Sequence, residues 1–252
     1  MSHFTFRENS ELKTAVNLWI SDKNAAENTY GDISHWDVYY ITDFSNLFSG
    51  KSTFNDDISS WDVRNGTDFS NMFSGANSFN QDIGSWNVGN GTDFSYMLSA
   101  SSFNQDIGSW NVGKGTDFSW MFYGASSFDK NIGSWDLSSA LKMQGIFSKA
   151  TAFNQDIGNW DVSKVSDFRW VFYEATNFNG DIGGWDLSSA SDLSSLFWEA
   201  TSFNQDIGNW NLNSVIDING LFYGASSFNR DIGSWDVSNI TNFGWAFYDA
   251  TE

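Results

Sequence analysis

Hydrophobic and polar positions recur along the chain with a period of 25 residues. A tryptophan followed by Asp or Asn marks each copy, and the spacing is broken once, by a single 24-residue step. These tryptophans are Trp36, Trp61, Trp86, Trp110, Trp135, Trp160, Trp185, Trp210 and Trp235. Fixed periods of this length are the signature of stacked repeats, in which each unit buries its apolar side chains only against its neighbours. The pattern predicts a solenoid of about nine units.

Each unit combines two apolar periodicities, as residues 153–177 illustrate. Ile157, Trp160 and Val162 follow the order apolar-x-x-apolar-x-apolar, whose last step is the alternation of a short strand. From Phe168 onward, apolar residues recur at i, i+3, i+4 and i+7, which is the spacing of one helical face. The unit is therefore predicted to contain a strand, a turn and a short helix.

This order of elements predicts an α/β fold, a leucine-rich-repeat-like solenoid of 25-residue strand–turn–short helix units. The reason is that the strand pattern matches the L-x-x-L-x-L portion of that repeat. A three-sided parallel β-helix, in which the helical stretch is extended instead, is the alternative. Residues 29–252 are assigned to the solenoid, and residues 1–28 to an N-terminal capping segment.

The N-terminal segment has a pattern of its own. Residues 11–20 place Leu12, Ala15, Val16 and Trp19 on one face of an amphipathic helix. We expect this helix to cover the open end of the first repeat. No equivalent cap is visible after the last repeat, where the sequence predicts either a cut through a longer array or a docking surface for another copy.

Composition and charge exclude several classes of partner. Aromatic residues make up 18% of the chain, with 14 Trp and 24 Phe, so material for a core is ample. The net charge of -19 repels phosphate backbones and anionic headgroups, which makes nucleic acid and membrane surfaces poor partners. No apolar run is long enough to span a membrane and no signal-peptide pattern is present, so we expect no membrane insertion.

The sequence offers little for catalysis. His3 and His35 are the only histidines, and there is no cysteine, so a catalytic triad or a zinc site has few residues to draw on. No phosphate-binding glycine motif occurs. Paired carboxylates such as Asp156 and Asp161 recur in nearly every copy, whereas an active site is normally a single break in a repeat. We predict that the protein is not an enzyme and needs no cofactor.

Three positions of the unit are acidic in most copies and would form columns at about 4.8 Å per turn. Backbone N–H groups, solvent or bridging calcium would relieve the repulsion between carboxylates of one column. For two of the columns, the one before Ile and the one at the predicted helix start, the favoured interpretation is hydrogen bonding to turn backbone. The column after Trp is expected to face the concave solvent side and to bind a cation, a sugar or a basic partner. This concave acidic stripe comprises Asp37, Asp62, Asp136, Asp161, Asp186 and Asp236. Calcium is a candidate ligand, although no known calcium loop motif fits.

A second candidate surface lies on the predicted helix, two and five residues after its first apolar position. These positions should face water at the helical period. The first two repeats hold Asn and Ser there, but later repeats hold large aromatics, which we term the aromatic ridge: Tyr96, Trp120, Tyr123, Trp170, Tyr173, Trp198, Tyr223, Trp245 and Tyr248. Exposed aromatic patches commonly mark interaction sites, so the ridge is predicted to bind a protein or glycan partner or a second copy. The alternative is that the rings pack on adjacent turns.

One repeat departs from this pattern. In the unit that follows Trp135, Leu141 and Lys142 replace the usual Thr-Asp pair, and Gln144-Gly145 replaces the first ridge aromatic. We expect this repeat to be the most irregular one, with local fraying.

The motifs F-N-Q-D-I-G-S-W-N-V and G-T-D-F-S-W-M-F-Y-G-A-S-S resemble the 25/26-residue repeat of BspA-like leucine-rich-repeat surface proteins of bacteria, from about Tyr30 to Thr251. The resemblance implies export, surface display and adhesion, and it carries over no catalytic residue. The chain departs from that family by lacking a signal peptide and an anchor. Together these observations predict a non-enzymatic, extracellular or cell-surface recognition module. The alternative is a structural repeat protein that self-assembles end to end or through the ridge.

Overall fold

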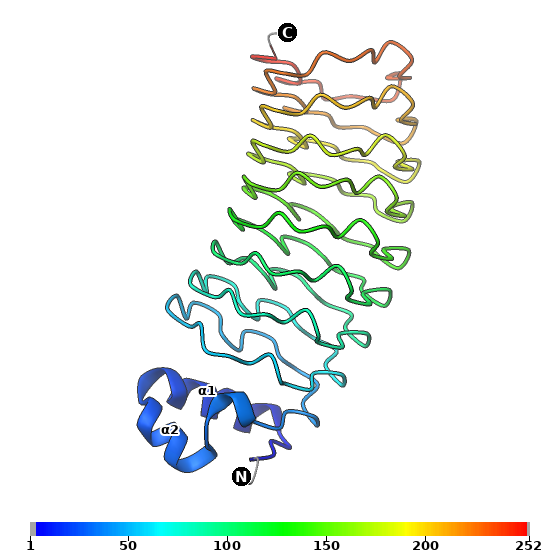
Figure 1. Ribbon diagram of the computed structural model, residues 1–252. Coiled ribbons are helices and arrows are strands. Elements are labelled where there is room, and N and C mark those ends of the chain that lie inside the picture. The colour runs from blue at the N-terminus through cyan, green and yellow to red at the C-terminus, as the bar shows by residue number, and fades with distance from the viewer. Residues whose placement is uncertain (1–3, 251–252) are drawn as a thin grey trace.

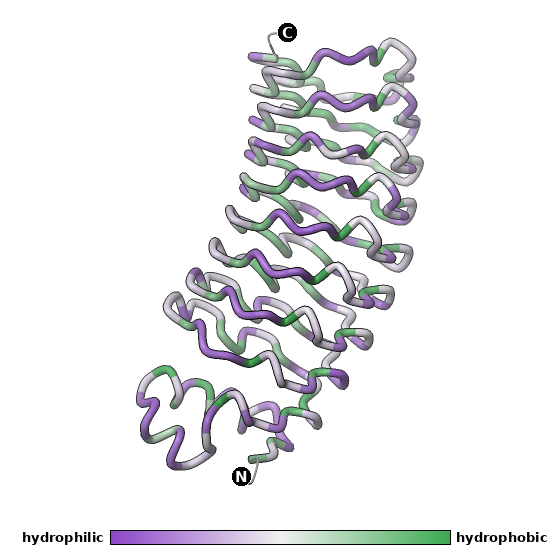
Figure 2. The backbone as a smooth tube through the Cα atoms, viewed as in Figure 1, coloured by the Kyte–Doolittle hydropathy of each residue, from purple (hydrophilic) through white to green (hydrophobic). Residues whose placement is uncertain are grey.

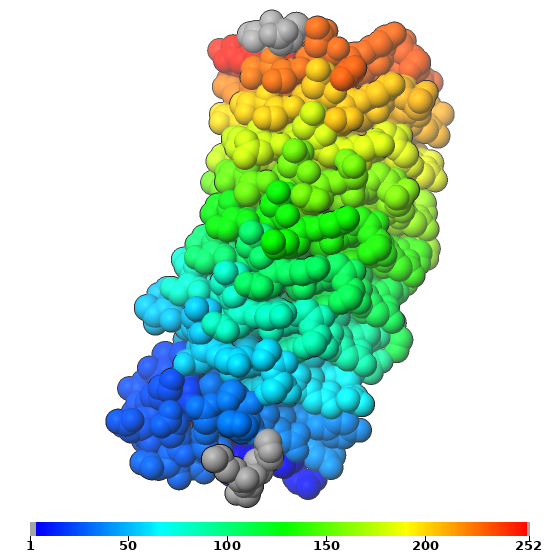
Figure 3. Space-filling model, viewed as in Figure 1, coloured from blue at the N-terminus to red at the C-terminus, as the bar shows by residue number. Residues whose placement is uncertain are grey.

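The computed structural model describes residues 4–250. Residues 1–3 of the predicted capping segment, including His3, and residues 251–252 of the predicted solenoid lie outside that part of the chain. The protein is an elongated stack, with helices at the N-terminal end and coil upon coil leading to the C-terminal end (Figure 1). In the space-filling view the colours change in bands along the long axis (Figure 3). Each coil therefore contacts chiefly its neighbours in sequence, as a repeat array requires.

Three short helices begin the chain: α1 (Asn9–Ser21), α2 (Lys23–Tyr30) and the 3-10 helix η1 (Ile33–His35). The buried residues of α1 are Leu12, Ala15, Val16 and Trp19, the four that the sequence places on one face. The Trp19 indole and the Lys23 ammonium both donate hydrogen bonds to Asp56, at 2.8 Å each. These contacts attach the helices to the first coils of the stack.

The predicted strand–turn–short helix unit is wrong, and so is the three-sided β-helix. Between residues 4 and 250 the only helices are α1, α2 and η1, and strand pairing is limited to isolated parallel bridges such as that between Asp192 and Asp217. Apart from the one between Thr5 and Asp37, the bridges fall at the start of the predicted helix, a position that is acidic in most coils. The stretch predicted as a strand, residues 157–162, forms none. The repeats are coils built from turns.

Hydrogen bonds explain why the apolar spacing does not produce a helix. The backbone N–H groups of Phe168, Trp170, Phe172 and Glu174 donate to carbonyls of the next coil at 2.6–3.2 Å. Of the N–H groups between them, those of Val171 and Tyr173 donate three residues back, and that of Arg169 donates to the Asp167 side chain. No i to i−4 ladder forms in this stretch. Trp170 and Glu174 also have φ values of 58° and 54°, outside the right-handed helical region. The spacing identifies buried positions correctly, but those positions lie on consecutive turns.

Aromatic columns fill the interior. Trp160 Nε1 donates to the Ile132 carbonyl of the preceding coil at 3.1 Å, and seven other repeats make the same bond. Phenylalanine rings stack from coil to coil, as for Phe147 and Phe172, whose centroids lie 5.8 Å apart with an interplanar angle of 6°. A buried indole needs a partner for its N–H, and the neighbouring coil supplies it. The core therefore combines ring stacking within a coil, as for Phe172 and Phe178, with stacking and indole hydrogen bonds between coils.

Polar side chains also connect successive coils. Hydrophilic segments align from one coil to the next along the outside of the stack (Figure 2). In one such column the Asn154 amide oxygen accepts the backbone N–H of Asn179 at 2.8 Å, and Asn179 does the same for Asn204. These asparagines, each of which follows a buried phenylalanine, thus satisfy the backbone of the following coil.

Candidate functional site

All three acidic columns are built into turns. In each, a carboxylate oxygen accepts the backbone N–H two residues later, as in Asp57, Asp161 and Asp192. This is the Asx-turn geometry favoured by Asp and Asn. The columns before Ile and at the predicted helix start therefore have the turn-bonding role that the sequence favoured for them.

The predicted concave acidic stripe follows the same rule. Asp37, Asp62, Asp136, Asp161, Asp186 and Asp236 each accept the N–H two residues on, at 2.9–3.3 Å. The pKa values of Asp136, Asp161 and Asp236 are lowered because a Ser side chain and its backbone N–H donate to each carboxylate. The stripe does reach solvent, but it extends from turns, because no strand exists there to orient it.

Metal ligation has little support in the described part of the chain. Within residues 4–250, no three or more His, Asp or Glu side chains gather closely enough to hold an ion. The carboxylates of the columns already accept hydrogen bonds from their own turns. Calcium binding therefore stays a prediction from the sequence. Over the same residues, no helix has the length and apolar character needed to cross a membrane.

The aromatic ridge is neither fully exposed nor fully buried. Seven of its members are half-buried, whereas Trp245 and Tyr248 on the last coil are 61% and 52% exposed. Rings of neighbouring coils lie against each other: Trp198 and Tyr223 stack with centroids 3.8 Å apart, and Tyr223 and Tyr248 with centroids 5.0 Å apart. The ridge is thus a set of rings that pack on adjacent turns and still present part of their surface to solvent.

Several ridge rings are held by an uncommon backbone conformation. Tyr96, Trp120, Trp170 and Trp245 have φ values between 54° and 61°. Other coils place Asn, Gly or, once, Ser195 at this position, and Asn and Gly adopt the left-handed region at lower cost. Bulky residues with positive φ concentrate at functional sites, where the surroundings hold the strain.

A pocket interrupts the ridge in the coil that the sequence marks as irregular. Gly145 and Ser148 take the two ridge positions there, so that coil contributes no ring. Trp120 lies over Gly145, where an added Cβ would come within 2.3 Å of the indole. The Trp120 centroid thereby reaches 5.7 Å from that of Trp170, two coils further on. This coil keeps backbone bonds to both neighbours, such as Phe122 N–H to the Ile146 carbonyl and Phe147 N–H to the Val171 carbonyl, but the run of parallel bridges is interrupted between Lys142 and Asp167.

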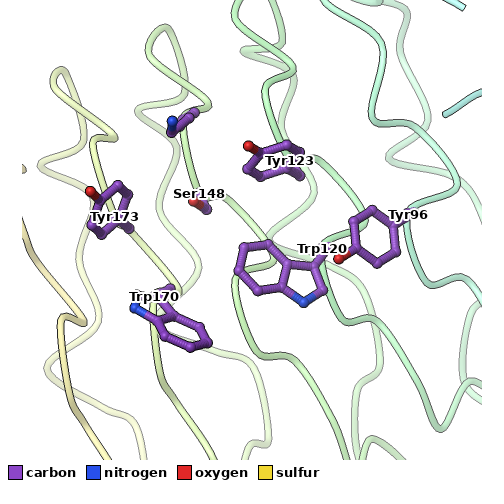
Figure 4. A pocket seen from close by; sticks show the side chains of 7 residues that line it. Tyr96, Trp120, Tyr123, Ser148, Trp170 and Tyr173 are labelled. Atoms are coloured by element: carbon purple, nitrogen blue, oxygen red, sulfur yellow. The ribbon is translucent and has the colours of Figure 1, made fainter. Parts of the chain in front are cut away.

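The resulting cavity, which we term the ridge pocket, is open and has a volume of about 540 Å³. Its lining consists of Tyr96, Trp120, Tyr123, Ser148, Lys149, Trp170 and Tyr173. Ser148 lies between Tyr123 and Tyr173, with the indoles of Trp120 and Trp170 along one side (Figure 4). The ridge rings of the sequence prediction thus form the walls, and the break in the repeat forms the floor.

The pocket contains few polar groups, and each is distinctive. Ser148 is 2% exposed as a residue, and its hydroxyl, which makes no hydrogen bond to another residue of 4–250, is open to the pocket, because no fully buried side-chain oxygen in that range lacks a partner. Lys149 Nζ lies 3.8 Å from the Glu174 carboxylate and 6.0 Å from the centroid of Tyr173. Burial, with a hydrogen bond to Glu174, raises the pKa of Tyr173, so its phenol stays protonated at neutral pH. Sequence reasoning missed Ser148 and Lys149, although Gln144-Gly145 signalled the break beside them.

Comparison with known proteins places the chain in a family. No curated protein and no solved structure matches it. One family model matches in three overlapping segments, residues 17–131, 100–197 and 180–252, which together extend over most of the chain. Repeated overlapping matches to one model are what a tandem-repeat protein produces. The chain therefore belongs to the repeat family described as "Mycoplasma protein of unknown function, DUF285".

Proposed function

We propose that this protein is a non-enzymatic recognition module that binds a protein or glycan partner through its aromatic ridge. The observation that carries the proposal is the ridge pocket, a cavity walled by aromatic rings at a coil that lacks them and lies between coils that have them. Aromatic side chains that remain partly exposed are the usual anchors of interfaces. The acidic columns are weaker candidates, because their oxygens are engaged in turns.

Surface display and adhesion belong to the same proposal. They are supported by the resemblance of the repeat to BspA-like leucine-rich-repeat surface proteins. A stack of coils suits that task, since it presents an extended flank to a partner while each coil needs only its neighbours for stability.

A second candidate function is self-assembly through the ridge, whose rings still present part of their surface to solvent. A second copy packed against the ridge would cover these rings. Light scattering over a concentration series separates the two functions, because growth in particle mass with concentration supports assembly and a constant monomer mass supports recognition.

Binding is tested on immobilised mucin, a heavily glycosylated protein. The ridge variant carries Trp198→Ser and Tyr223→Ser, and the control is Ile216→Ser, which changes a 53% exposed apolar residue outside the ridge. We expect the ridge variant to bind at least about tenfold more weakly than the parent and the control to be unchanged. Equal binding by all three proteins would refute the ridge as the binding surface. Periodate oxidation of the mucin then distinguishes a glycan partner, whose binding is lost, from a protein partner, whose binding persists.

A further inference from the structure

The ridge contains a column of rings with one member missing. Tyr173, Trp198, Tyr223 and Tyr248 occupy equivalent positions in four successive coils, and each contacts the next with centroids 3.8–6.0 Å apart. Tyr123 has the same position two coils before Tyr173. Ser148 lies between them, and it leaves the column without a ring at that level.

The space left by the missing ring has the width of one ring. Phe122, Phe147 and Phe172, each next to a member of this column, stack at 5.5 Å and 5.8 Å per coil. Rings two coils apart are then separated by roughly 11 Å, the sum of two such steps. A ring inserted between two others needs roughly 7–8 Å in total, because non-bonded carbons meet at about 3.5–4.0 Å. The level of Ser148 therefore has room for a six-membered ring between Tyr123 and Tyr173.

The neighbouring ridge position shows what happens when such a gap is not kept open. There Gly145 supplies no side chain, and the Trp120 indole lies over Gly145 and contacts Trp170. That gap is closed by the protein's own rings. The gap at Ser148 differs, because Tyr123 and Tyr173 remain on opposite sides of it with the pocket between them (Figure 4).

The floor of the gap specifies a ligand with polar groups. Among the described residues no fully buried side-chain oxygen lacks a partner, so a hydroxyl that makes no hydrogen bond within the protein is open to solvent or to a ligand. Ser148 is 2% exposed and faces the pocket without a partner among the described residues. The Lys149 ammonium, next in sequence, is a further hydrogen-bond donor among the lining residues. A suitable occupant therefore has two apolar faces for the flanking rings and hydroxyl groups at its edge.

We propose that the ridge pocket binds one pyranose unit of a neutral glycan, whose ring takes the place of the missing aromatic between Tyr123 and Tyr173. This inference rests on the proposed recognition function and names the ligand class of one site on the ridge. A pyranose presents C–H faces to the two rings and a hydroxyl to Ser148. A phenylalanine side chain from a protein partner would stack equally well but would leave the Ser148 hydroxyl unpaired.

Charge favours a neutral sugar over an acidic one. Lys149 is the positive group in the pocket, and the Glu174 carboxylate 3.8 Å away offsets it. The chain as a whole carries a net charge of -19, which repels anionic ligands at long range.

The test uses methyl glycosides of glucose, galactose, mannose and N-acetylglucosamine at millimolar concentrations, followed by saturation-transfer NMR and tryptophan fluorescence. We expect at least one of them to bind the full chain. Ser148→Tyr, which restores the missing ring, should abolish binding, whereas Ser148→Ala, which removes only the hydroxyl, should weaken it about two- to tenfold. Ser49→Tyr is the matched control, because it adds the same ring at the equivalent position of a distant coil and should leave binding unchanged.

Two results would overturn the inference: absence of binding by all four glycosides, or unchanged binding by Ser148→Ala and Ser148→Tyr. Preferential binding of N-acetyltyrosinamide over every glycoside would also overturn it, in favour of a protein side chain. If Ser148→Tyr does not fold, as judged by its thermal transition, the Ser148→Ala series still decides the matter. The mucin experiment separates failure of the pyranose site from failure of the proposed function. The proposed function fails only if the Trp198→Ser, Tyr223→Ser variant binds mucin as well as the parent does.

Discussion

The core tryptophans offer the most direct measurement of how the stack is held together. Trp160 is 2% exposed, stacks on Trp135 with centroids 6.4 Å apart, and lies 5.9 Å from Phe147. Its indole N–H donates to the Ile132 carbonyl of the preceding coil at 3.1 Å. Trp160→Ala therefore removes packing and a hydrogen bond at the same junction between coils.

The expected loss is the sum of these two contributions. Emptying a buried aromatic site costs about 3–5 kcal/mol, because the surroundings collapse only partly. The hydrogen bond adds about 1 kcal/mol, a net value that applies because the Ile132 carbonyl still accepts the backbone N–H of Trp135. We expect about 4–6 kcal/mol in total. Trp160→Phe retains a ring but loses the N–H, so about 1–2 kcal/mol is expected.

Equilibrium urea unfolding measures both variants, and Trp235→Ala is the control. Trp235 makes the same indole bond, to Ile207, but it is 9% exposed near the open end of the stack. Its replacement should cost clearly less, because there is less packing beyond it to lose. In a one-dimensional array a weakened central junction should also uncouple the two halves, so that Trp160→Ala unfolds in two steps. A loss below about 1 kcal/mol, or an equal loss at Trp235, would contradict the role assigned to Trp160.

Two further predictions concern the ridge and the acidic columns. Gly145→Ala should displace Trp120, because the new Cβ would lie 2.3 Å from the indole. Gly124 also has positive φ but open space around it, so Gly124→Ala should cost only the backbone strain of about 1 kcal/mol. Thermal unfolding compares the two variants, and equal losses of stability would argue against the Trp120 contact. Burial raises the pKa of Asp117, but hydrogen bonds from the following turn and from Lys142 lower it overall. The ionised carboxylate therefore stabilises the fold above about pH 4, and this contribution is lost as the pH falls toward the lowered pKa. Asp117→Asn should flatten the acid side of the stability–pH curve, and an unchanged curve would contradict the shift.

Part of the site was visible in the sequence and part was not. The ridge aromatics stood out because they recur at fixed positions, and the pocket walls consist of them. Ser148 and Lys149 carry no such signal, because a serine and a lysine are ordinary on a repeat surface. Their significance depends on the rings in the flanking coils, which lie about 25 residues away in sequence.

The sequence alone determined the period, the buried positions and the turns. In every 25-residue unit before the last one, the core apolar residues are buried where the pattern placed them, and Asp and Asn form turns because their side chains bond to nearby backbone. What only the tertiary structure decided is the conformation between those points. A helical spacing of apolar residues is also produced by successive turns, and here alternate N–H groups donate to the next coil, an option that no single repeat can reveal. The ridge pocket also depends on neighbouring coils. The absence of a ring at Ser148 produces a cavity only because the adjacent coils supply rings on either side.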